Sequence, residues 1–323
     1  MDRSSRGTGP NPSRVASSDA IFFYALSALL IFVPLFWGGI EPLPLLAAEL
    51  AALALLAGQA CWAPTSFGRS LSRLAQIFLV ALALLPLSQL LPVPLALWSD
   101  LPGRSFYADA LRQAGVGGPG FEWRAISLLP STTESAGLGL LPPLAVFVVA
   151  VGLRGQLLLK LVPVFLGIAV GDALLGLIQY GDGPGSRFRL GNDLMGDSAM
   201  GTYINRNHLA GLLEMALPLA LGQLAATVGQ SPRQHIGRRQ RNWRRWLARL
   251  SAARFNRAML FGAMALAILL GLIFTRSRAG VLMAMLGIVL CTLLFSNRLG
   301  GRNAHGLLGT VTAVGIGLAS LIG

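Results

Sequence analysis

The feature that most constrains this chain is a series of long apolar runs, each close to the length of a helix that crosses a membrane. A transmembrane helix needs about 20 apolar residues. With 54% hydrophobic and only 12% charged residues in a chain of 323, a soluble domain is excluded. We predict nine spans, at residues 20–38, 43–63, 74–91, 137–153, 161–180, 207–229, 258–275, 279–295 and 305–323.

The predicted fold is all-α, a polytopic helical membrane protein with about nine transmembrane helices. Strands of a membrane barrel are shorter and alternate polar with apolar positions, whereas these runs are continuous and rich in Leu and Ala. A basic segment precedes the first run, as in a secretory signal. That run is longer than usual for a signal and no convincing cleavage site follows, so we expect a retained span. The expected organisation is an N-terminal tail over 1–19 and a transmembrane domain over 20–323.

Basic residues gather in alternate loops, and this pattern predicts the orientation. The 230–257 loop contains nine arginines and no acidic residue, and the other loops on its side of a nine-span chain also carry Arg or Lys. Since such loops stay in the cytoplasm, we expect the N-terminal tail and loop 230–257 there. The long loops 92–136 and 181–206 mix both signs of charge and are expected on the periplasmic side.

The stretch "FTRSRAGVL" places Arg276 and Arg278 in a turn on the side that the charge rule disfavours. A charge held at the membrane surface is costly without a partner, and the planar guanidinium suits carboxylate or phosphate oxygens. Ser277 is a candidate N-cap for the next span, whose first amides would point at the same place. The turn therefore predicts an anion site. The alternative is that the arginines reach lipid headgroups or pair with an acid from a neighbouring loop.

A second polar cluster, in "MGTYINRNHLAGLLEMALPLALG", lies where the 181–206 loop meets the sixth span. Asn205, Arg206, Asn207 and His208 are consecutive there, and so many donors at one membrane boundary favour a functional role.

Two polar stripes follow the fifth and sixth spans at helical spacing. One stripe holds Asp172, Gly176 and Gln179, and the other holds Asn207, Gly211, Glu214 and Pro218. Intramembrane acids usually face a bundle interior or a water-filled cavity, and glycines allow close helix contact. We therefore expect these two helices to meet along the stripes. Hydrogen bonding between helices, without chemistry, is the alternative role for Asp172, Gln179 and Glu214.

Together, "GTYINRNHLAGLL" and, about seventy residues later, "TRSRAGVLMA" resemble the O-antigen ligase and polysaccharide polymerase superfamily of bacterial inner-membrane proteins. Members commonly begin one span with Asn-x-Asn-[His/Phe]-x-Ala and a later span with Ser-Arg-[Gly/Ala]-Gly. The resemblance covers about 30 residues, and the apolar layout of the remaining chain is compatible with it.

The resemblance implies glycan transfer at the periplasmic face, from an undecaprenyl-pyrophosphate-linked saccharide donor to the hydroxyl of a glycan or lipid acceptor. Arg278 matches the motif arginine, with Arg276 as its helper, and Ser277 between them is a candidate substrate-binding residue. Asn205, Asn207 and His208 match the other motif and would shape the site or hold sugar or phosphate oxygens. We add three neighbouring polar residues as candidate substrate-binding residues, namely Arg206, Glu214 and Asp172.

Arginines placed in this way would stabilise the pyrophosphate leaving group without a metal, so no cofactor is expected. The two cysteines, Cys61 and Cys291, fall at or inside apolar spans and indicate neither a disulfide framework nor a zinc site. The aspartates at 182, 193 and 197 have a spacing that fits no metal-binding loop.

Family members continue past the second motif into a large loop with a further arginine and a histidine that is thought to activate the acceptor. The present sequence stops at "VGIGLASLIG", inside the ninth apolar run. By this comparison the chain is either the N-terminal portion of a longer protein or a reduced relative, and activity of the chain alone is not expected. His208 could substitute as the general base, because imidazole titrates near neutrality.

The segment "GRRQRNWRRWLARL", residues 237–250, has Trp and Leu at i, i+3, i+4 and i+7, with arginines largely on another face. This pattern predicts an amphipathic helix on the anionic cytoplasmic leaflet. We therefore expect anionic membrane lipids as partners of this segment and no nucleic acid.

Two other classes of function remain open on the sequence. Intramembrane acids with Gly and Pro interruptions also suit a permease or a transporter of lipid-linked oligosaccharides. Transporters usually bind near the membrane midplane, and here the strongest polar clusters lie at the outer edge. The third possibility is a non-catalytic partner in an envelope-glycan assembly complex.

Overall fold

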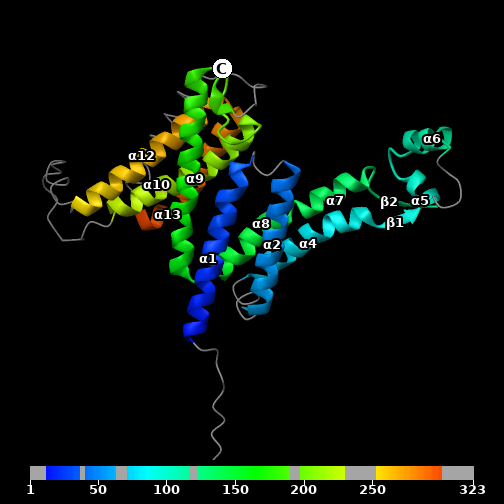
Figure 1. Cartoon of the computed structure of the whole chain (residues 1–323), viewed down its shortest axis with the longest axis horizontal. Coiled ribbons are helices and arrows are strands. Elements are labelled where there is room, and N and C mark those ends of the chain that lie inside the picture. The colour runs from blue at the N-terminus through cyan, green and yellow to red at the C-terminus, as the bar shows by residue number, and fades with distance from the viewer. Residues whose placement is uncertain are drawn as a thin grey trace, which may run out of the picture. The chain divides into compact units, whose positions relative to one another are not determined.

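The computed structural model of the chain is all-α apart from one short strand pair, and it describes residues 12–36, 41–62, 71–115, 122–189, 197–229 and 252–299 (Figure 1). The long helices are α1 (Pro12–Leu35), α2 (Pro42–Trp62), α4 (Arg73–Leu90), α9 (Gly155–Asp182), α10 (Arg206–Gly229), α12 (Ala252–Phe274) and α13 (Arg278–Leu299). The shorter elements are β1 (Pro92–Pro94), α5 (Leu95–Asp100), α6 (Ser105–Gln113), β2 (Trp123–Ala125), α7 (Pro130–Leu138), α8 (Leu141–Gly152) and the 3-10 turn η2 (Arg187–Arg189).

Within the described residues, seven helical stretches are long and apolar enough to cross a membrane. They correspond to the first seven predicted spans, which confirms a multi-pass helical membrane protein. The eighth predicted span is the helix α13, whose apolar part, Arg278–Leu293, is shorter. The predicted ninth span, 305–323, and the predicted amphipathic helix, 237–250, lie outside the described residues.

The fourth span begins earlier than the sequence predicted. Helix starts at Pro130 rather than near residue 137, and α7 and α8 are separated by Gly139 and Leu140. Proline fits the first turn of a helix, but "STTES" after it adds no apolar signal, so hydropathy assigned these residues to the loop 92–136. That loop also contains structure of its own, because β1 and β2 pair in antiparallel fashion with Val93 opposite Arg124.

The chain divides into two compact units, 1–29 with 42–158 and 30–41 with 159–323. In the first unit α2 packs against α8, and α4 packs against α7. An ion pair of 2.8 Å joins Asp19 in α1 to Arg154, just after α8. A buried carboxylate needs such a partner, so the pair fixes the beginning of the first span to the turn between α8 and α9.

In the second unit α10 packs along both α12 and α13. The core of this unit is built mainly from Leu and Ala of α9, α10, α12 and α13, for example Leu166, Leu213, Ile268 and Ala284. Ala and Gly let helices approach closely, as is usual where lipid gives little hydrophobic driving force between helices.

A close crossing in this core lies between α9 and α12. A Cβ placed on Gly271 would lie 2.8 Å from the Cβ of Ala173 and 3.1 Å from its Cα. We expect Gly271→Ala to destabilise the protein by about 1–3 kcal/mol through overpacking, which exceeds the gain of about 1 kcal/mol in helix propensity. Thermal unfolding of purified protein in detergent measures this change.

The matched control is Gly262→Ala in the same helix, where an added Cβ meets nothing within 4 Å. This variant should melt at or slightly above the temperature of the parent protein. Equal melting temperatures for the two variants would contradict the close crossing at Gly271.

Candidate functional site

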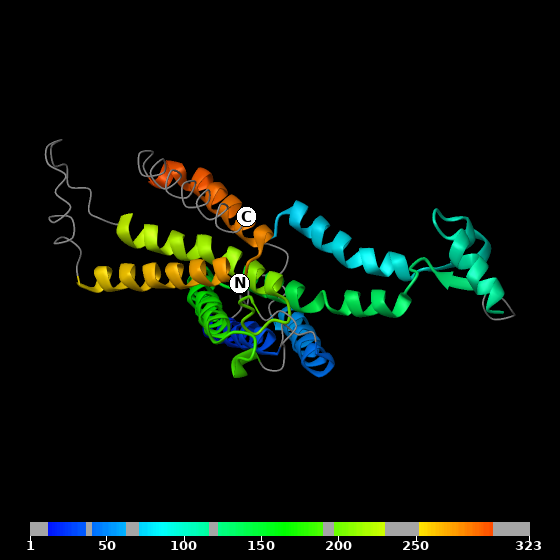
Figure 2. The same ribbon diagram turned by 90° about the horizontal axis from the view of Figure 1, so that it is seen from above.

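The two motif stretches meet at one end of the second unit. We call residues 274–278 the arginine turn and residues 197–205 the lead-in loop, because this loop runs into the start of α10. The amide of Ala199 donates a 2.8 Å hydrogen bond to the carbonyl oxygen of Phe274. Figure 2 shows α10 beginning, α12 ending and α13 beginning at this same end. The two motifs, which the sequence predicts on the same side of the membrane, lie at the same end of this unit, and their side of the membrane stays a prediction.

The first turns of α10 and α13 are also in direct contact. A Cβ on Gly280 would lie only 2.6 Å from the Cβ of Ala210, so the two helices can approach this closely only because residue 280 lacks a side chain. The two helix N-termini, each the positive end of a helix dipole, consequently lie beside each other.

Ser277 is the N-cap of α13, as predicted. Its buried Oγ accepts a 3.2 Å hydrogen bond from the amide of Gly280, and its own amide donates to Oγ1 of Thr275 at 3.2 Å. Thr275 is fully buried and donates back to the carbonyl oxygen of Leu272 at 2.6 Å. These bonds end α12 and start α13 within a few residues, which leaves Ser277 in a structural role.

Arg276 has a backbone φ of +55°, a left-handed conformation that is strained for residues other than glycine. Its guanidinium pairs with the carboxylate of Asp197 in the lead-in loop at 2.5 Å, and both side chains are largely exposed. One of the alternatives left open by the sequence, an acid from a neighbouring loop, therefore holds for Arg276.

Arg278 is the first residue of α13 and its side chain is exposed. Within the part of the chain that the structure describes, it forms no ion pair with an acidic residue. An exposed arginine beside two helix N-termini and beside Arg276 is suited to bind an anion.

At the start of α10, Asn205 is the N-cap. Its Oδ1 accepts a 2.8 Å hydrogen bond from the amide of Asn207, and its carbonyl oxygen accepts from the amide of His208 at 2.9 Å. Arg206 follows the cap in the first turn, and the side chains of Asn207 and His208 are exposed. The His208 ring packs edge-on against the Tyr203 ring, with 6.4 Å between centroids.

The lead-in loop is anchored to α9 by Asp172. This buried carboxylate accepts hydrogen bonds at Oδ1 from the amide of Thr202 at 2.9 Å and from its hydroxyl at 2.8 Å. Gly201, with φ of +60°, lets the loop pass so close that a Cβ there would lie 2.8 Å from Oδ1. Asp172 acts on the site through the loop, and a direct contact with substrate stays a prediction.

Tyr203 lies beside this anchor. Burial, and to a lesser extent the charge of the Asp172 carboxylate, raises the pKa of the Tyr203 phenol far above its ordinary value. The phenol therefore stays neutral at physiological pH and can act as a hydrogen-bond donor at the site.

The expected contact between the polar stripes of α9 and α10 is only half correct. The α9 stripe is buried, and Gly176 faces Ala199 and Leu209. The α10 stripe is not the packing face, since Asn207 is exposed and an added Cβ on Gly211 meets nothing within 4 Å. The packing face of α10 is its Leu and Ala stripe instead, because those side chains fill the core against α12 and α13.

Glu214 lies on the partly exposed side of α10. At a rise of about 1.5 Å per residue it is about 12 Å along the helix from Arg206. The structure therefore does not place it in the first turn with the other candidates, and its role in binding stays a prediction.

Two buried residues, Gln179 and Arg189, hold the lead-in loop in place, and the sequence did not predict this shared role. Gln179, 1% exposed, donates to the carbonyl oxygens of Phe188 at 3.0 Å and Gly201 at 2.7 Å, and accepts from the amide of Met200 at 3.2 Å. Arg189 donates to three carbonyl oxygens, those of Gly183 at 3.1 Å, Gln179 at 3.2 Å and Ser198 at 3.4 Å.

These bonds join the end of α9 to the lead-in loop and satisfy carbonyls that a helix C-terminus leaves free. The only sequence signal was the spacing of Gln179 in the α9 stripe. Nothing in the local sequence distinguishes Arg189 from the solvated arginine at position 187.

The sequence matches no family model, no curated protein and no solved structure. The seven long apolar helices of the described residues identify the chain as a polytopic helical membrane protein.

Proposed function

We propose that this protein takes part in lipid-linked glycan transfer in cell-surface polysaccharide or O-antigen biosynthesis, as a metal-independent glycosyltransferase of the O-antigen ligase and polymerase type. The observation that carries the proposal is the meeting of the two resembling motifs. The motifs are about seventy positions apart in the sequence, yet Gly280 of one lies against Ala210 of the other. Residues just before or within the motifs also bond, in the hydrogen bond from Ala199 to Phe274 and the ion pair between Arg276 and Asp197.

The proposed location is the bacterial inner membrane, with the N-terminus in the cytoplasm and the arginine turn at the periplasmic surface. The basic loop 230–257 supports this orientation through the positive-inside rule. A lipid pyrophosphate with its chain in the bilayer holds its phosphates at the depth where helix N-termini meet the headgroups, which is where the proposed orientation puts Arg278.

In the proposed reaction, the acceptor hydroxyl oxygen attacks the anomeric carbon of the donor saccharide. The bond from that carbon to the pyrophosphate oxygen breaks, and its electron pair stays on the pyrophosphate. Arg278, with Arg276 beside it, stabilises the charge that develops on the leaving group. The hydroxyl proton goes to a general base, for which His208 is the exposed imidazole at the site.

The transport alternative gains no support from the intramembrane acid of α9. A transporter would use Asp172 at an open binding site, but two hydrogen bonds from Thr202 occupy its Oδ1. An acid that fixes a surface loop fits interfacial chemistry better than translocation.

Binding of a radiolabelled undecaprenyl-pyrophosphate saccharide to purified protein in detergent tests the proposal without requiring a complete acceptor site. Saturable binding is expected, and inorganic pyrophosphate at millimolar concentration should compete. Absence of binding, both by this chain and by any longer product of its gene, would overturn the proposal.

Replacing the acidic partner of Arg276 should strengthen this binding. Asp197→Asn frees the guanidinium and removes a negative charge next to the bound phosphates. Exposed ion pairs are worth about 0.2–1 kcal/mol, so we expect the donor dissociation constant to fall by up to about fivefold. The matched control is Asp182→Asn, since Asp182 accepts from Ser186 at 3.1 Å and pairs with no described arginine. An equal gain in both variants would point to net charge alone.

A further inference from the structure

The segment between α4 and α7, described at residues 91–115 and 122–129, forms a small body with a core of its own. We call it the surface segment. Trp98 of α5 is 2% exposed and its indole Nε1 donates to the carbonyl oxygen of Ala125 at 2.9 Å. The guanidinium carbons of Arg104 and Arg124 lie 4.9 Å and 5.4 Å from the centroid of its ring. Cation–π contacts of this kind hold β2 and the start of α6 onto α5.

Although this core is filled, the outside of the surface segment is unusually apolar. Phe106 is 75% exposed, Trp123 is 62% exposed and Leu97 is 61% exposed. Several other large apolar side chains of the segment are also exposed, namely Leu91, Leu101, Tyr107, Leu128 and Leu129. A body of this size in water does not leave so many large apolar side chains uncovered unless something binds them.

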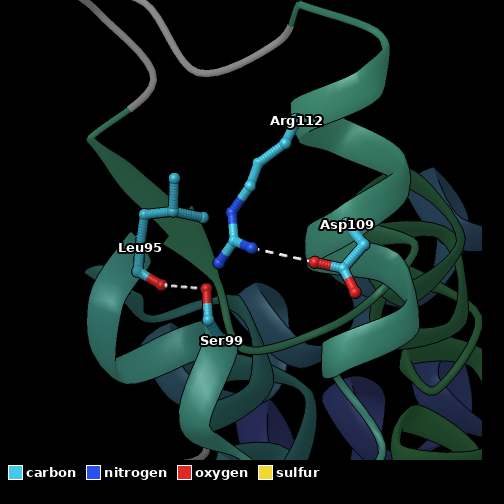
Figure 3. A network of polar contacts seen from close by, with 4 residues as sticks. All are labelled: Leu95, Ser99, Asp109 and Arg112. Atoms are coloured by element: carbon cyan, nitrogen blue, oxygen red, sulfur yellow. Dashed lines mark hydrogen bonds and ion pairs between the residues drawn. The ribbon is translucent and has the colours of Figure 1, made fainter.

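The apolar side of α6 faces away from the core of the segment. At 100° per residue, Phe106 and Ala110 lie opposite Ala108, which is the buried residue of this helix. The polar side is formed by the ion pair between Asp109 and Arg112, at 2.8 Å on the helix surface (Figure 3). In the neighbouring α5, Ser99 satisfies its own hydroxyl by donating to the carbonyl oxygen of Leu95 at 2.7 Å, which Figure 3 also shows.

Both ends of the surface segment are tied to membrane spans. The helix α4 ends at Leu90 and β1 begins at Pro92, while β2 ends at Ala125 and the next span begins at Pro130. The two ends are also bonded to each other, since the amide of Ser127 donates to the carbonyl oxygen of Gln89 at 2.8 Å. The segment is therefore held within a few residues of the membrane surface. The lipid there is the nearest apolar surface that its exposed side chains can contact.

We propose that the surface segment lies on the membrane, with the exposed apolar side chains of α5, α6 and β2 inserted into the boundary between headgroups and hydrocarbon. Phe, Tyr, Trp and Arg are the side chains that favour this boundary. The segment carries three arginines and three acidic residues (Arg104, Arg112 and Arg124, with Asp100, Asp109 and Glu122), so its net charge is zero. Insertion is therefore driven by apolar contact and does not require anionic lipid.

Site-directed spin labelling of the whole chain in lipid nanodiscs tests this proposal. A background without cysteine, made by Cys61→Ser and Cys291→Ser, receives single cysteines by Phe106→Cys, Trp123→Cys or Leu97→Cys. Collision with oxygen, which concentrates in lipid, is compared with collision with a water-soluble nickel complex. The labels are expected to collide with oxygen more than with nickel, to the same extent in pure phosphatidylcholine and with added phosphatidylglycerol.

The matched control is Asp109→Cys on the polar side of α6, which should collide mainly with nickel. Labels at 97, 106 and 123 that behave like the label at 109 would show a solvated surface and overturn the proposal. Labels shielded from both reagents would show a protein partner or a second copy of the chain, which also overturns it. Dependence on phosphatidylglycerol would overturn insertion by apolar contact. Three independent positions keep the test valid if one substitution disturbs the fold.

Discussion

Replacing Arg278 with Lys is expected to reduce glycan transfer about 100- to 1,000-fold, the usual loss when one preorganised donor to a developing charge is removed. Lysine keeps the positive charge but cannot offer two parallel N–H donors to phosphate oxygens. Because the Arg278 side chain is exposed and Ser277 caps the helix, insertion and melting temperature should stay unchanged. Transfer of a labelled saccharide from undecaprenyl pyrophosphate is measured with this chain and with any longer product of its gene.

The matched control is Arg257→Lys, an exposed arginine in the first turns of α12, at the far end of that helix from the arginine turn. It makes the same chemical change away from the site and should leave transfer intact. Unchanged transfer in Arg278→Lys would overturn the assignment. Equal loss in both variants would show that the substitutions act on the fold or on insertion.

The membrane class of the protein could be predicted from apolar run length alone, because a helix that crosses a bilayer must satisfy all its backbone groups within the segment. Boundaries were less predictable where polar residues continue a helix. Residues 130–136 are helical although they add little hydropathy. Pro130 starts this helix, and none of its residues is buried, so apolar side chains are not required to form it. The strand pair in the same region depends on pairing between residues far apart in the sequence, such as Val93 with Arg124, which are 31 positions apart.

The candidate site was predictable where its structure is local. Ser277 as an N-cap follows from the residues beside it, as does the cap at Asn205. The anchors of the lead-in loop were not predictable, because Asp172 and Gln179 bind backbone groups 21 to 30 residues away. The packing face of α10 was misjudged for a related reason. A polar stripe suggested the interior, but the Leu and Ala stripe buries more apolar surface.

The anchoring role of Gln179 leads to the largest expected structural effect. In Gln179→Leu the carbonyl oxygens of Phe188 and Gly201 and the amide of Met200 lose their side-chain partner. Each buried group left unsatisfied costs about 1–3 kcal/mol. When the loop opens, these groups can bind water instead, so the free energy of opening falls. We expect hydrogen exchange at Met200 and Thr202 to accelerate at least 100-fold, as measured by mass spectrometry of protein in detergent.

Gln156→Leu is the matched control, because Gln156 is an exposed residue of the same helix, and its exchange pattern should equal that of the parent protein. The Gln179→Leu variant should also lose donor binding while its spans stay protected, because Tyr203 and Asn205 belong to the released loop and Phe274 loses the bond from Ala199. Fast exchange with intact donor binding would show that the lead-in loop is not needed for donor binding. Slow exchange would mean that the remaining bonds, such as those of Asp172 to Thr202 and of Arg189 to Ser198, hold the loop without Gln179.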